Sequence, residues 1–329
     1  MSRRSQIVLG CLAALTLLLA PLAMKPYGIY VMTLWVVMTI AAVGLNLTLG
    51  YAGQISLAQA AFVGVGAYSV AILMSHGGSF WLGLLLAVGL CLALGWLLGY
   101  PALRVQHHYL AFVTLSFSTL AYLVFRNEEW LTGGTYGLSG IKRPMLLWWK
   151  TDSPYAYYLF CLAALAVVTA LVAWIVRSPW GRAFTALREN PVRASSLGVD
   201  TRRYTLMAFA IGSTLGGVAG ALYAPLVQFV DPSMFILNLS LSLLLMVIVG
   251  GAGFFFGPYL GALVAVLLPE WLRFSEGMYL IVYALLVMVL LAFCPTGLLG
   301  LLRRGRSVVV RRTHQLAPEP APPAEGEGK

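Results

Sequence analysis

Charged residues are scarce in this sequence, and this scarcity decides its class. Asp, Glu, Lys and Arg make up 10% of the 329 residues, whereas a soluble domain carries about 25%. Hydrophobic residues make up 60%, and the mean hydropathy is +0.87. Apolar runs of roughly 20 residues, long enough to cross a bilayer as a helix, recur along almost the whole chain. The runs are continuous rather than alternating, so the sequence predicts an all-α polytopic membrane protein and not a β-barrel.

The sequence also lacks the patterns of metal, redox and nucleotide chemistry. Its four cysteines lie far apart within apolar runs and form no CxxC pair. None of the four histidines has a partner at metal-ligand spacing, and no set of acids or Ser/His residues suggests an enzyme. No G-x-x-x-x-G-K-[ST] motif occurs, so we do not expect ATP binding through a P-loop. We predict no catalytic residue, no metal site and no cofactor on this chain.

Carboxylates are nearly absent from the apolar runs, which bears on any transport mechanism. Asp231 lies at the end of one run, and Glu270 lies three residues before Arg273, a spacing that permits a helical ion pair. A proton- or sodium-coupled carrier usually places a carboxylate or a polar cluster near the membrane midplane. The sequence therefore disfavours a secondary transporter without excluding one, because unwound backbone carbonyls can also bind sodium.

About ten transmembrane helices are predicted, some of them broken by glycine. The first run resembles a signal peptide but has no A-x-A cleavage site, so we expect it to remain as an uncleaved helix. The third is doubtful as a simple helix, because its start is polar and glycine-rich; it either crosses fully or re-enters. The predicted spans are 7–24, 30–49, 51–74, 80–100, 109–125, 155–176, 206–230, 235–254, 258–272 and 278–293.

Basic residues predict the orientation of these spans. The chain has 21 Lys and Arg against 11 Asp and Glu, with a pI near 9.6, and in a membrane protein this excess indicates cytoplasmic loops rather than nucleic-acid binding. If both termini are cytoplasmic, Arg104, the segment 177–203 and the C-terminal tail lie inside, and fewer basic residues lie outside. We therefore predict a transmembrane domain over 1–302 and a basic, then disordered, cytoplasmic tail over 303–329.

Two connections are longer than the others. The outer one, 126–154, contains TGGTYGLSG and several aromatic residues that suit a membrane interface. The inner one, 177–205, is rich in arginine. Within it Ser178-Pro179 can start a short helix, Pro191 marks a break, and a second short helix can end at a glycine. This segment is either a solvated basic loop or a surface that a cytoplasmic partner grips.

Glycines recur at four-residue intervals in two of the predicted spans. They are Gly212, Gly216 and Gly220 in one span, and Gly253 and Gly257 near another. Stripes of small residues let helix backbones approach closely, because dispersion holds helices together in lipid. We interpret both sets as helix-packing residues and not as a nucleotide site, since they lie in apolar surroundings.

Several motifs occur in one order along the chain. GYAGQISLAQAAF at 50–62 continues with GVGAY; YLAFVTL and GLSGI follow at 109–115 and 137–141; GGAG, GP and PTGL come near the C-terminal end. Over about residues 30–302 these motifs resemble the permeases of branched-chain amino-acid ABC transporters, and GLSGI resembles the LivM member of the LivH/LivM pair. The chain departs from that family at Ala58-Gln59, where Gly-His is usual, and in the proline expected near Lys142.

The resemblance implies a role for each piece. It implies a second, related permease of LivH type, two cytoplasmic ATP-binding subunits that hold the ATP, an external solute-binding protein that the outer segment faces, and a bacterial inner membrane. The residues implied to couple to the ATPase are Arg188, Glu189, Ala194 and Gly198. The residues implied to line the substrate pathway, where backbone and polar groups could serve a zwitterion, are Gly50, Gly53, Gln54, Ser56 and Gln59.

The expected function is therefore the permease subunit of an importer of leucine, isoleucine and valine. Urea, short amides and other amino acids are alternative substrates within the same family. An ion-coupled secondary transporter is the alternative class: it predicts uptake that follows an ion gradient without ATPase partners, whereas a permease subunit should be inactive alone.

Overall fold

The computed structural model of the chain describes residues 16–102, 107–146, 149–271 and 297–300, with the single residues 282, 285 and 288. Residues 7–15 of the predicted span 7–24 and most of the span 278–293 lie outside the described residues, as do Arg104 and the tail from 303 onward.

Five described helices are long and apolar enough to cross a membrane. They are α2 (Pro26–Leu45, which continues as a π-helical turn η2, Asn46–Tyr51), α4 (Phe80–Ala102), α5 (His107–Asn127), α7 (Pro154–Arg177) and α10 (Thr201–Val227). Three shorter apolar helices accompany them: α3 (Gln59–Ser75), α11 (Leu237–Gly250) and α12 (Gly257–Trp271). The prediction of a helical, polytopic membrane protein is confirmed.

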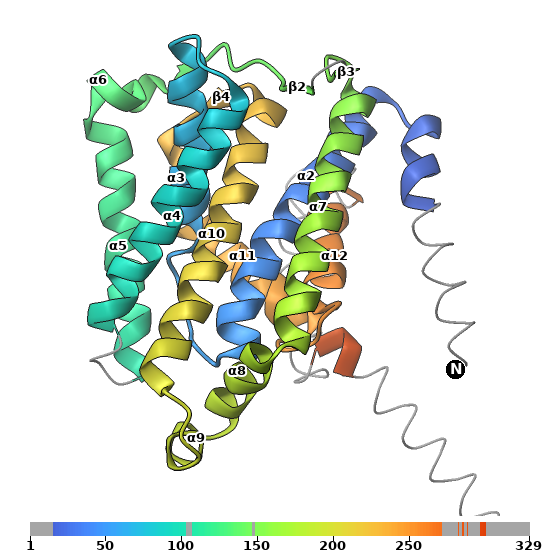
Figure 1. Cartoon of the computed structure of the whole chain (residues 1–329). Coiled ribbons are helices and arrows are strands. Elements are labelled where there is room, and N and C mark those ends of the chain that lie inside the picture. The colour runs from blue at the N-terminus through green and yellow to red at the C-terminus, as the bar shows by residue number, and fades with distance from the viewer. Residues whose placement is uncertain are drawn as a thin grey trace, which may run out of the picture.

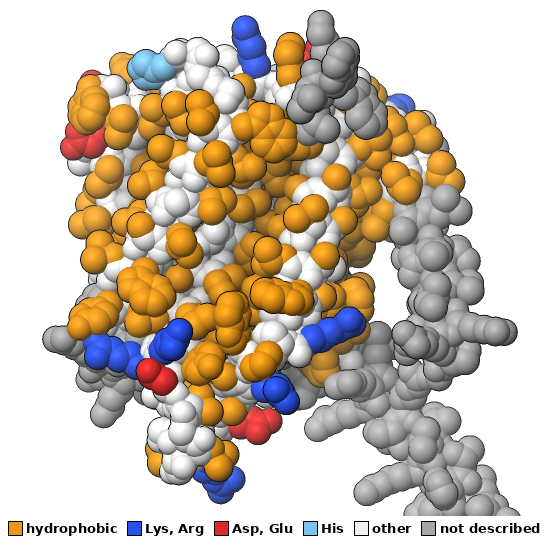
Figure 2. All heavy atoms as spheres, viewed as in Figure 1, with side chains coloured by type: hydrophobic (Ala, Val, Ile, Leu, Met, Phe, Trp, Pro, Cys, Tyr) orange, Lys and Arg blue, Asp and Glu red, His pale blue; other side chains and the backbone are white. Residues whose placement is uncertain are grey.

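The centre of the bundle is formed by α2 and α10, which are buried along most of their length (Figure 1). α2 is apolar on every side, as expected of a helix surrounded by others, and Val36, Ile40 and Ala41 are fully buried. α3 and α4 pack against α10, while α7 and α12 pack against α2. The outer helices turn large apolar side chains such as Leu85, Phe112 and Val167 outward. Figure 2 shows these side chains covering the flank, with charged side chains near its two ends.

The two long connections lie at opposite ends of the bundle (Figure 1). One end carries α6 (Glu129–Thr132), the 3₁₀ turns η3 (Gly134–Tyr136) and η4 (Pro232–Phe235), and four short strands. The other end carries α8 (Pro179–Glu189) and α9 (Pro191–Ser196). A further 3₁₀ turn, η1 (Ala20–Ala23), precedes α2.

The strands are a small exception to the all-helical prediction. β1 (Leu138–Ser139) pairs antiparallel with β4 (Phe229–Val230), and β2 (Met145–Leu146) pairs antiparallel with β3 (Trp149–Lys150). The first pair ties the GLSGI motif to the end of α10. It depends on a glycine, because Gly137 has φ +66° and its Cα lies against the backbone of Val230. Hydrophobic periodicity in the sequence cannot predict paired strands that are only two residues long.

Several span boundaries differ from the prediction. α10 begins at Thr201 rather than 206, because the Asp200 side chain caps it by accepting a hydrogen bond from Arg203 N at 3.0 Å. α11 ends at Gly250 rather than 254, because Gly251 and Gly253 have φ of +112° and +84° and cannot continue a helix. Gly253 therefore lies in the turn between α11 and α12, and not in a helical stripe with Gly257.

Candidate functional site

The site is built around the break between α2 and α3. The last turn of α2 widens into the π-helix η2 beside the α8–α9 end, and residues 52–58 then run without regular structure before α3 begins. α3 leads away to the opposite end, where it contacts β1, β4 and η4. The doubtful span 51–74 therefore crosses the bundle as an irregular half followed by a helical half. π-helical turns within helices are frequent at functional sites.

Hydroxyl groups from other helices support the irregular segment 52–58. Leu57 N donates to Thr114 Oγ1 of α5 at 3.0 Å, and Ser240 Oγ of α11 donates to Leu57 O at 2.7 Å. Ser240 Oγ also accepts a hydrogen bond from Ala60 N at 3.0 Å. Non-helical backbone at membrane depth is tolerated only where protein or a water-filled cavity satisfies it. Thr114 and Ser240 thus stabilise the irregular backbone. Thr114 was noted in the sequence only as part of the motif YLAFVTL, and Ser240 was not singled out.

Two predicted pathway residues, Gln54 and Gln59, are buried and bonded within the chain. Gln59 Nε2 donates to Ala41 O of α2 at 3.0 Å and to Gly212 O of α10 at 3.2 Å. Gln54 Nε2 donates to Thr205 O, also of α10, at 3.2 Å. Both amides therefore bridge the break to the central helices. Buried polar groups need such partners, since an unpaired one costs about 1–3 kcal/mol.

The remaining predicted pathway residues differ in their exposure. Ser56 is buried, and its Oγ accepts a hydrogen bond from Ala58 N at 3.3 Å. Gly53, with φ +71°, is partly exposed, while Gly50 is buried at the end of η2. Within the segment it is Ile55, at 46% exposed, that faces outward. That these residues line a substrate route stays a prediction, and Ile55 joins them as an apolar candidate.

The predicted pair of short helices in the segment 177–205 is present. α8 begins at Pro179 as predicted, whereas α9 begins at Pro191, where a break was expected, and not at Ala194. Ser178 caps α8 by accepting a hydrogen bond from Trp180 N at 3.1 Å, and Asn190 caps α9 by accepting one from Arg193 N at 3.0 Å. α9 ends before Gly198, which has φ +82°. These caps follow from local sequence, since Ser and Asn followed by Pro favour a helix start.

The predicted coupling residues differ in their exposure. Glu189 is exposed, whereas Ala194 is buried. α9 and the residue after it also expose two large apolar side chains that the sequence reasoning missed, Val192 at 72% and Leu197 at 83%. Exposed apolar side chains among charged ones are typical of a contact surface. The sequence did contain a signal for these two residues. Val192 follows Pro191 and Leu197 precedes Gly198, and Pro and Gly mark the two boundaries of α9.

Arg188 connects α8 to the break. Its Nη1 donates to Gly50 O, at the end of η2. Its Cα would lie 3.3 Å from a Cβ on Gly53, and its guanidinium occupies the space where Gly253 would carry a Cβ. We call this contact between Arg188, Gly50, Gly53 and Gly253 the Arg188 node. The three glycines belong to two separate motifs, GYAG and GGAG. A larger residue at any of these positions would come too close to other groups of the node.

Asn46 reinforces the same junction from within η2. Its Oδ1 accepts a hydrogen bond from Gly253 N at 2.9 Å, and its Nδ2 donates to Phe254 O at 3.1 Å. The turn between α11 and α12 is therefore tied to the end of α2. With Arg188, it joins α8, η2 and this turn into one hydrogen-bonded unit.

The glycine stripe of α10 faces the break. A Cβ on Gly212 would lie 2.7 Å from Gly44 O of α2, and a Cβ on Gly216 would lie 2.9 Å from Gln59 Nε2. A Cβ on Gly220 would overlap the carbonyl of Val63 in α3. Gly257, the first residue of α12, lies against the backbone of Gly251. Gly212, Gly220 and Gly257 lie where helices or turns approach backbone to backbone, and Gly216 lies against the side chains of Gln59 and Phe62. This is the arrangement expected of small-residue packing.

Comparison with known proteins identifies the class of this membrane protein. Residues 27–293 match the family described as "Branched-chain amino acid transport system / permease component", and the chain belongs to that family. The high-affinity branched-chain amino acid transport system permease protein LivM of Escherichia coli (strain K12) is 34% identical over 296 residues, which cover 82% of this chain and 69% of that protein. The chain is thus a LivM-type member of the family.

More distant relatives extend this result. The probable branched-chain amino acid transport permease protein LivM of Methanocaldococcus jannaschii is 26% identical over 318 residues, covering 79% of this chain and 89% of that protein. LivH of Salmonella typhimurium (strain LT2) is 27% identical over 278 residues, covering 79% of this chain and 90% of that protein. These relatives indicate a permease of an amino-acid ABC importer that has a paired permease. No solved structure matches the chain.

Proposed function

We propose that this chain forms the LivM half of the membrane channel of a bacterial importer for leucine, isoleucine and valine. A LivH-type permease completes the channel in the inner membrane, two cytoplasmic subunits bind and hydrolyse ATP, and an external binding protein delivers the substrate. The chain itself supplies no cofactor. Its relatives, which are named as branched-chain amino acid permeases, support the substrate class, and the lack of a P-loop motif fits ATP binding by other subunits.

The proposed orientation places α8 and α9 in the cytoplasm and the segment 126–154 outside. Arginines gather at the α8–α9 end, and positive loops are retained in the cytoplasm. α7 joins the two ends, so their sidedness must be opposite. Both termini are then cytoplasmic, as the predicted span count requires.

The proposed mechanism uses α9 as the contact for an ATP-binding subunit and the Arg188 node as the link into the membrane. Val192 and Leu197 offer exposed apolar side chains that a groove on the ATPase can bury. A ligand shifts an equilibrium only by its differential affinity for the two states, so this contact must differ between ATP-bound and free partners. Movement of α8 reaches η2 through the hydrogen bond from Arg188 to Gly50 O.

From η2 the movement reaches the irregular segment 52–58. Leu57 N donates to Thr114 Oγ1, and Ser240 Oγ donates to Leu57 O. These bonds hold this segment in place, and they involve few groups compared with a continuous helix. Ile55, the segment's exposed side chain, then changes position relative to the partner permease. We propose that the substrate passes along this face, where the apolar Ile55 suits a branched aliphatic side chain.

The test is ATP-driven uptake by the complete complex in proteoliposomes. We expect leucine uptake that requires ATP, both permeases and the loaded binding protein. Double replacement V192D/L197D should prevent co-purification of the ATP-binding subunits. Tyr136→Ser, which alters an equally exposed side chain at the opposite end (84% exposed), should leave co-purification unchanged. Uptake by this chain alone, driven by an ion gradient and unaffected by the double replacement, would contradict the proposal.

The Arg188 node has a separate readout. Arg188→Ala should leave the ATP-binding subunits attached, because α9 is untouched, but substrate-stimulated ATP hydrolysis and uptake should both fall. Arg182→Ala removes an exposed arginine from the same helix and serves as the matched control. If both variants transport equally well, the node does not transmit the movement of α8.

A further inference from the structure

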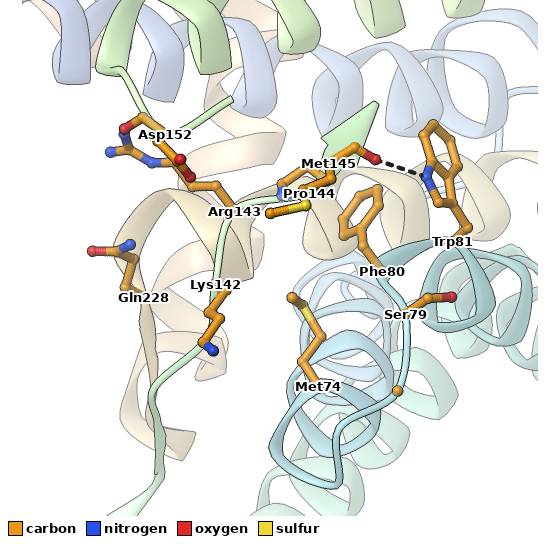
Figure 3. A pocket seen from close by; sticks show the side chains of 11 residues that line it. Met74, Ser79, Phe80, Trp81, Lys142, Arg143, Pro144, Met145, Asp152 and Gln228 are labelled. Atoms are coloured by element: carbon orange, nitrogen blue, oxygen red, sulfur yellow. Dashed lines mark hydrogen bonds between the residues drawn. The ribbon is translucent and has the colours of Figure 1, made fainter. Parts of the chain in front are cut away.

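A hollow of about 410 Å³ lies at the end of the bundle opposite α8 and α9 (Figure 3). The turn from α3 into α4 forms one wall, and residues 142–145 form another, with Asp152 and Gln228 completing the lining. The hollow therefore lies at the level where helices end and the polar membrane interface begins. It is separate from the break between α2 and α3 and from the Arg188 node, and it has no role in the coupling described above.

The hollow carries two cations, Lys142 and Arg143. Lys142 is exposed. Arg143 is held in place: its Nη1 donates to the backbone oxygen of Asp152 at 2.6 Å, and its guanidinium carbon lies 5.6 Å from the centre of the Tyr157 ring. These two contacts fix the plane of the guanidinium. A fixed, planar guanidinium is suited to a phosphate group, which accepts several hydrogen bonds at once.

A second cavity, of about 330 Å³, begins at the same Trp81 that closes the hollow. It lies between α4 and α7, with Val218 and Leu222 of α10 also in its lining, which is almost entirely apolar. Along α7 it extends from Ala156 to Val167, which is about 16 Å at 1.5 Å per residue. This is close to half of the roughly 30 Å hydrocarbon core, the depth of one leaflet.

Trp81 lies where the two cavities meet. Its side chain is 43% exposed, and its Nε1 donates to Met145 O at 3.4 Å, the bond drawn in Figure 3. Tryptophan is enriched at the membrane interface because its ring is apolar and its N–H is polar. The order of groups is therefore a cationic hollow at the end, an interfacial indole, and an apolar groove reaching into the membrane.

We propose that the two cavities together bind one anionic phospholipid. Its phosphate contacts Arg143 and Lys142, and one acyl chain lies in the groove between α4 and α7. The apolar lining of the groove and its length of about one leaflet fit a single acyl chain. The negative charge follows from the two cations of the hollow, which outnumber its one carboxylate, Asp152. The proposal does not depend on the transported substrate or on the coupling route.

The experiment measures quenching of Trp81 by lipids brominated in their acyl chains. The complete complex is placed in nanodiscs that contain a small fraction of brominated phosphatidylglycerol or, separately, brominated phosphatidylcholine. The difference between the wild type and Trp81→Phe isolates the signal of Trp81 from that of the other tryptophans. We expect that signal to be quenched at least about twofold more by the anionic lipid than by the zwitterionic one, as binding to a cationic site requires.

Three variants divide the site into its parts. Lys142→Gln and Arg143→Gln should remove the preference for the anionic lipid, and Ala163→Phe, which fills the groove, should reduce quenching by both lipids. Lys25→Gln removes an exposed lysine before α2 and should leave the preference intact. Equal quenching by the two lipids in the wild type would overturn the proposal. So would cross-linking of Ala163→Cys to a partner subunit, because protein would then occupy the groove.

Discussion

α10 approaches α3 so closely at Gly220 that we expect Gly220→Ala to destabilise the protein, whereas the same substitution at an exposed glycine should not. At Gly220 a Cβ would overlap the carbonyl of Val63, lying 2.7 Å from its carbon and 2.9 Å from Ala67 N. Comfortable separations are about 3.5–4.0 Å, so the helices would have to move apart by about 1 Å. The obstacle is backbone rather than a flexible side chain, so Gly220→Ala should destabilise by about 3 kcal/mol, the upper part of the range for overpacking.

Gly89 of α4 is the matched control. It is exposed, and a Cβ there would meet nothing within 4 Å. Alanine favours a helix over glycine by about 1 kcal/mol, so Gly89→Ala should be neutral or stabilising. The two changes are chemically identical and differ only in what the new methyl group meets.

The assay is thermal denaturation of the assembled complex, followed through a fluorescent tag on this chain during size-exclusion chromatography. Each kcal/mol shifts a midpoint by about 2–4 °C in proteins of 150–250 residues. Gly220→Ala should therefore melt several degrees below the wild type, and Gly89→Ala at or above it. Equal midpoints for the two variants would refute the packing of α10 against α3.

Three further predictions concern the break, the orientation and α9. Ser240→Ala removes the partner of two backbone groups, Leu57 O and Ala60 N, and should destabilise by about 2 kcal/mol or more. Ser75→Ala, whose exposed hydroxyl bonds to the nearby Ile72 O and His76 Nδ1, should not, and the same melting assay separates them. Single cysteines at Thr135 and Thr185, in a background without native cysteines, should react with an impermeant reagent from opposite sides of the membrane, and labelling of both from one side would contradict the span count. Gly198→Val forces a branched residue to φ +82°, a strain of about 1–3 kcal/mol, and should reduce co-purification of the ATP-binding subunits without lowering the amount of this chain in the membrane; normal co-purification would show that α9 needs no such turn.

The parts of the fold that the sequence predicted well depend on neighbouring residues. Ser178 and Asn190 each cap a helix whose first residue is proline, so the boundaries of α8 and α9 follow from a few adjacent positions. The apolar runs likewise predict the long helices, because the length needed to cross a bilayer is fixed. Such features can be predicted from residues that are adjacent in the sequence.

The parts that the sequence did not predict depend on distant partners. Ser240 holds a backbone oxygen 183 positions earlier, and Arg188 donates to a carbonyl 138 positions earlier. A serine in an apolar run and an arginine in a basic loop carry no mark of such contacts. The sequence predicted Arg188 as part of the ATPase contact, whereas its Nη1 bonds inward to Gly50 O. Gln59 was predicted to line the pathway, which stays a prediction, and the bonds of its amide to α2 and α10 were not predicted.

The irregular segment 52–58 also has a consequence for the order in which the protein can be made. Chains emerge from the ribosome N-terminus first, so α2 and α3 reach the membrane long before α11. Until Thr114 and then Ser240 have been synthesised, the backbone of Leu57 has neither of the partners it has in the folded protein, and lipid offers no substitute. The segment 52–58 therefore cannot adopt its final conformation as it emerges from the ribosome. It must wait, at the membrane surface or shielded by other proteins, until more than half of the chain has followed it.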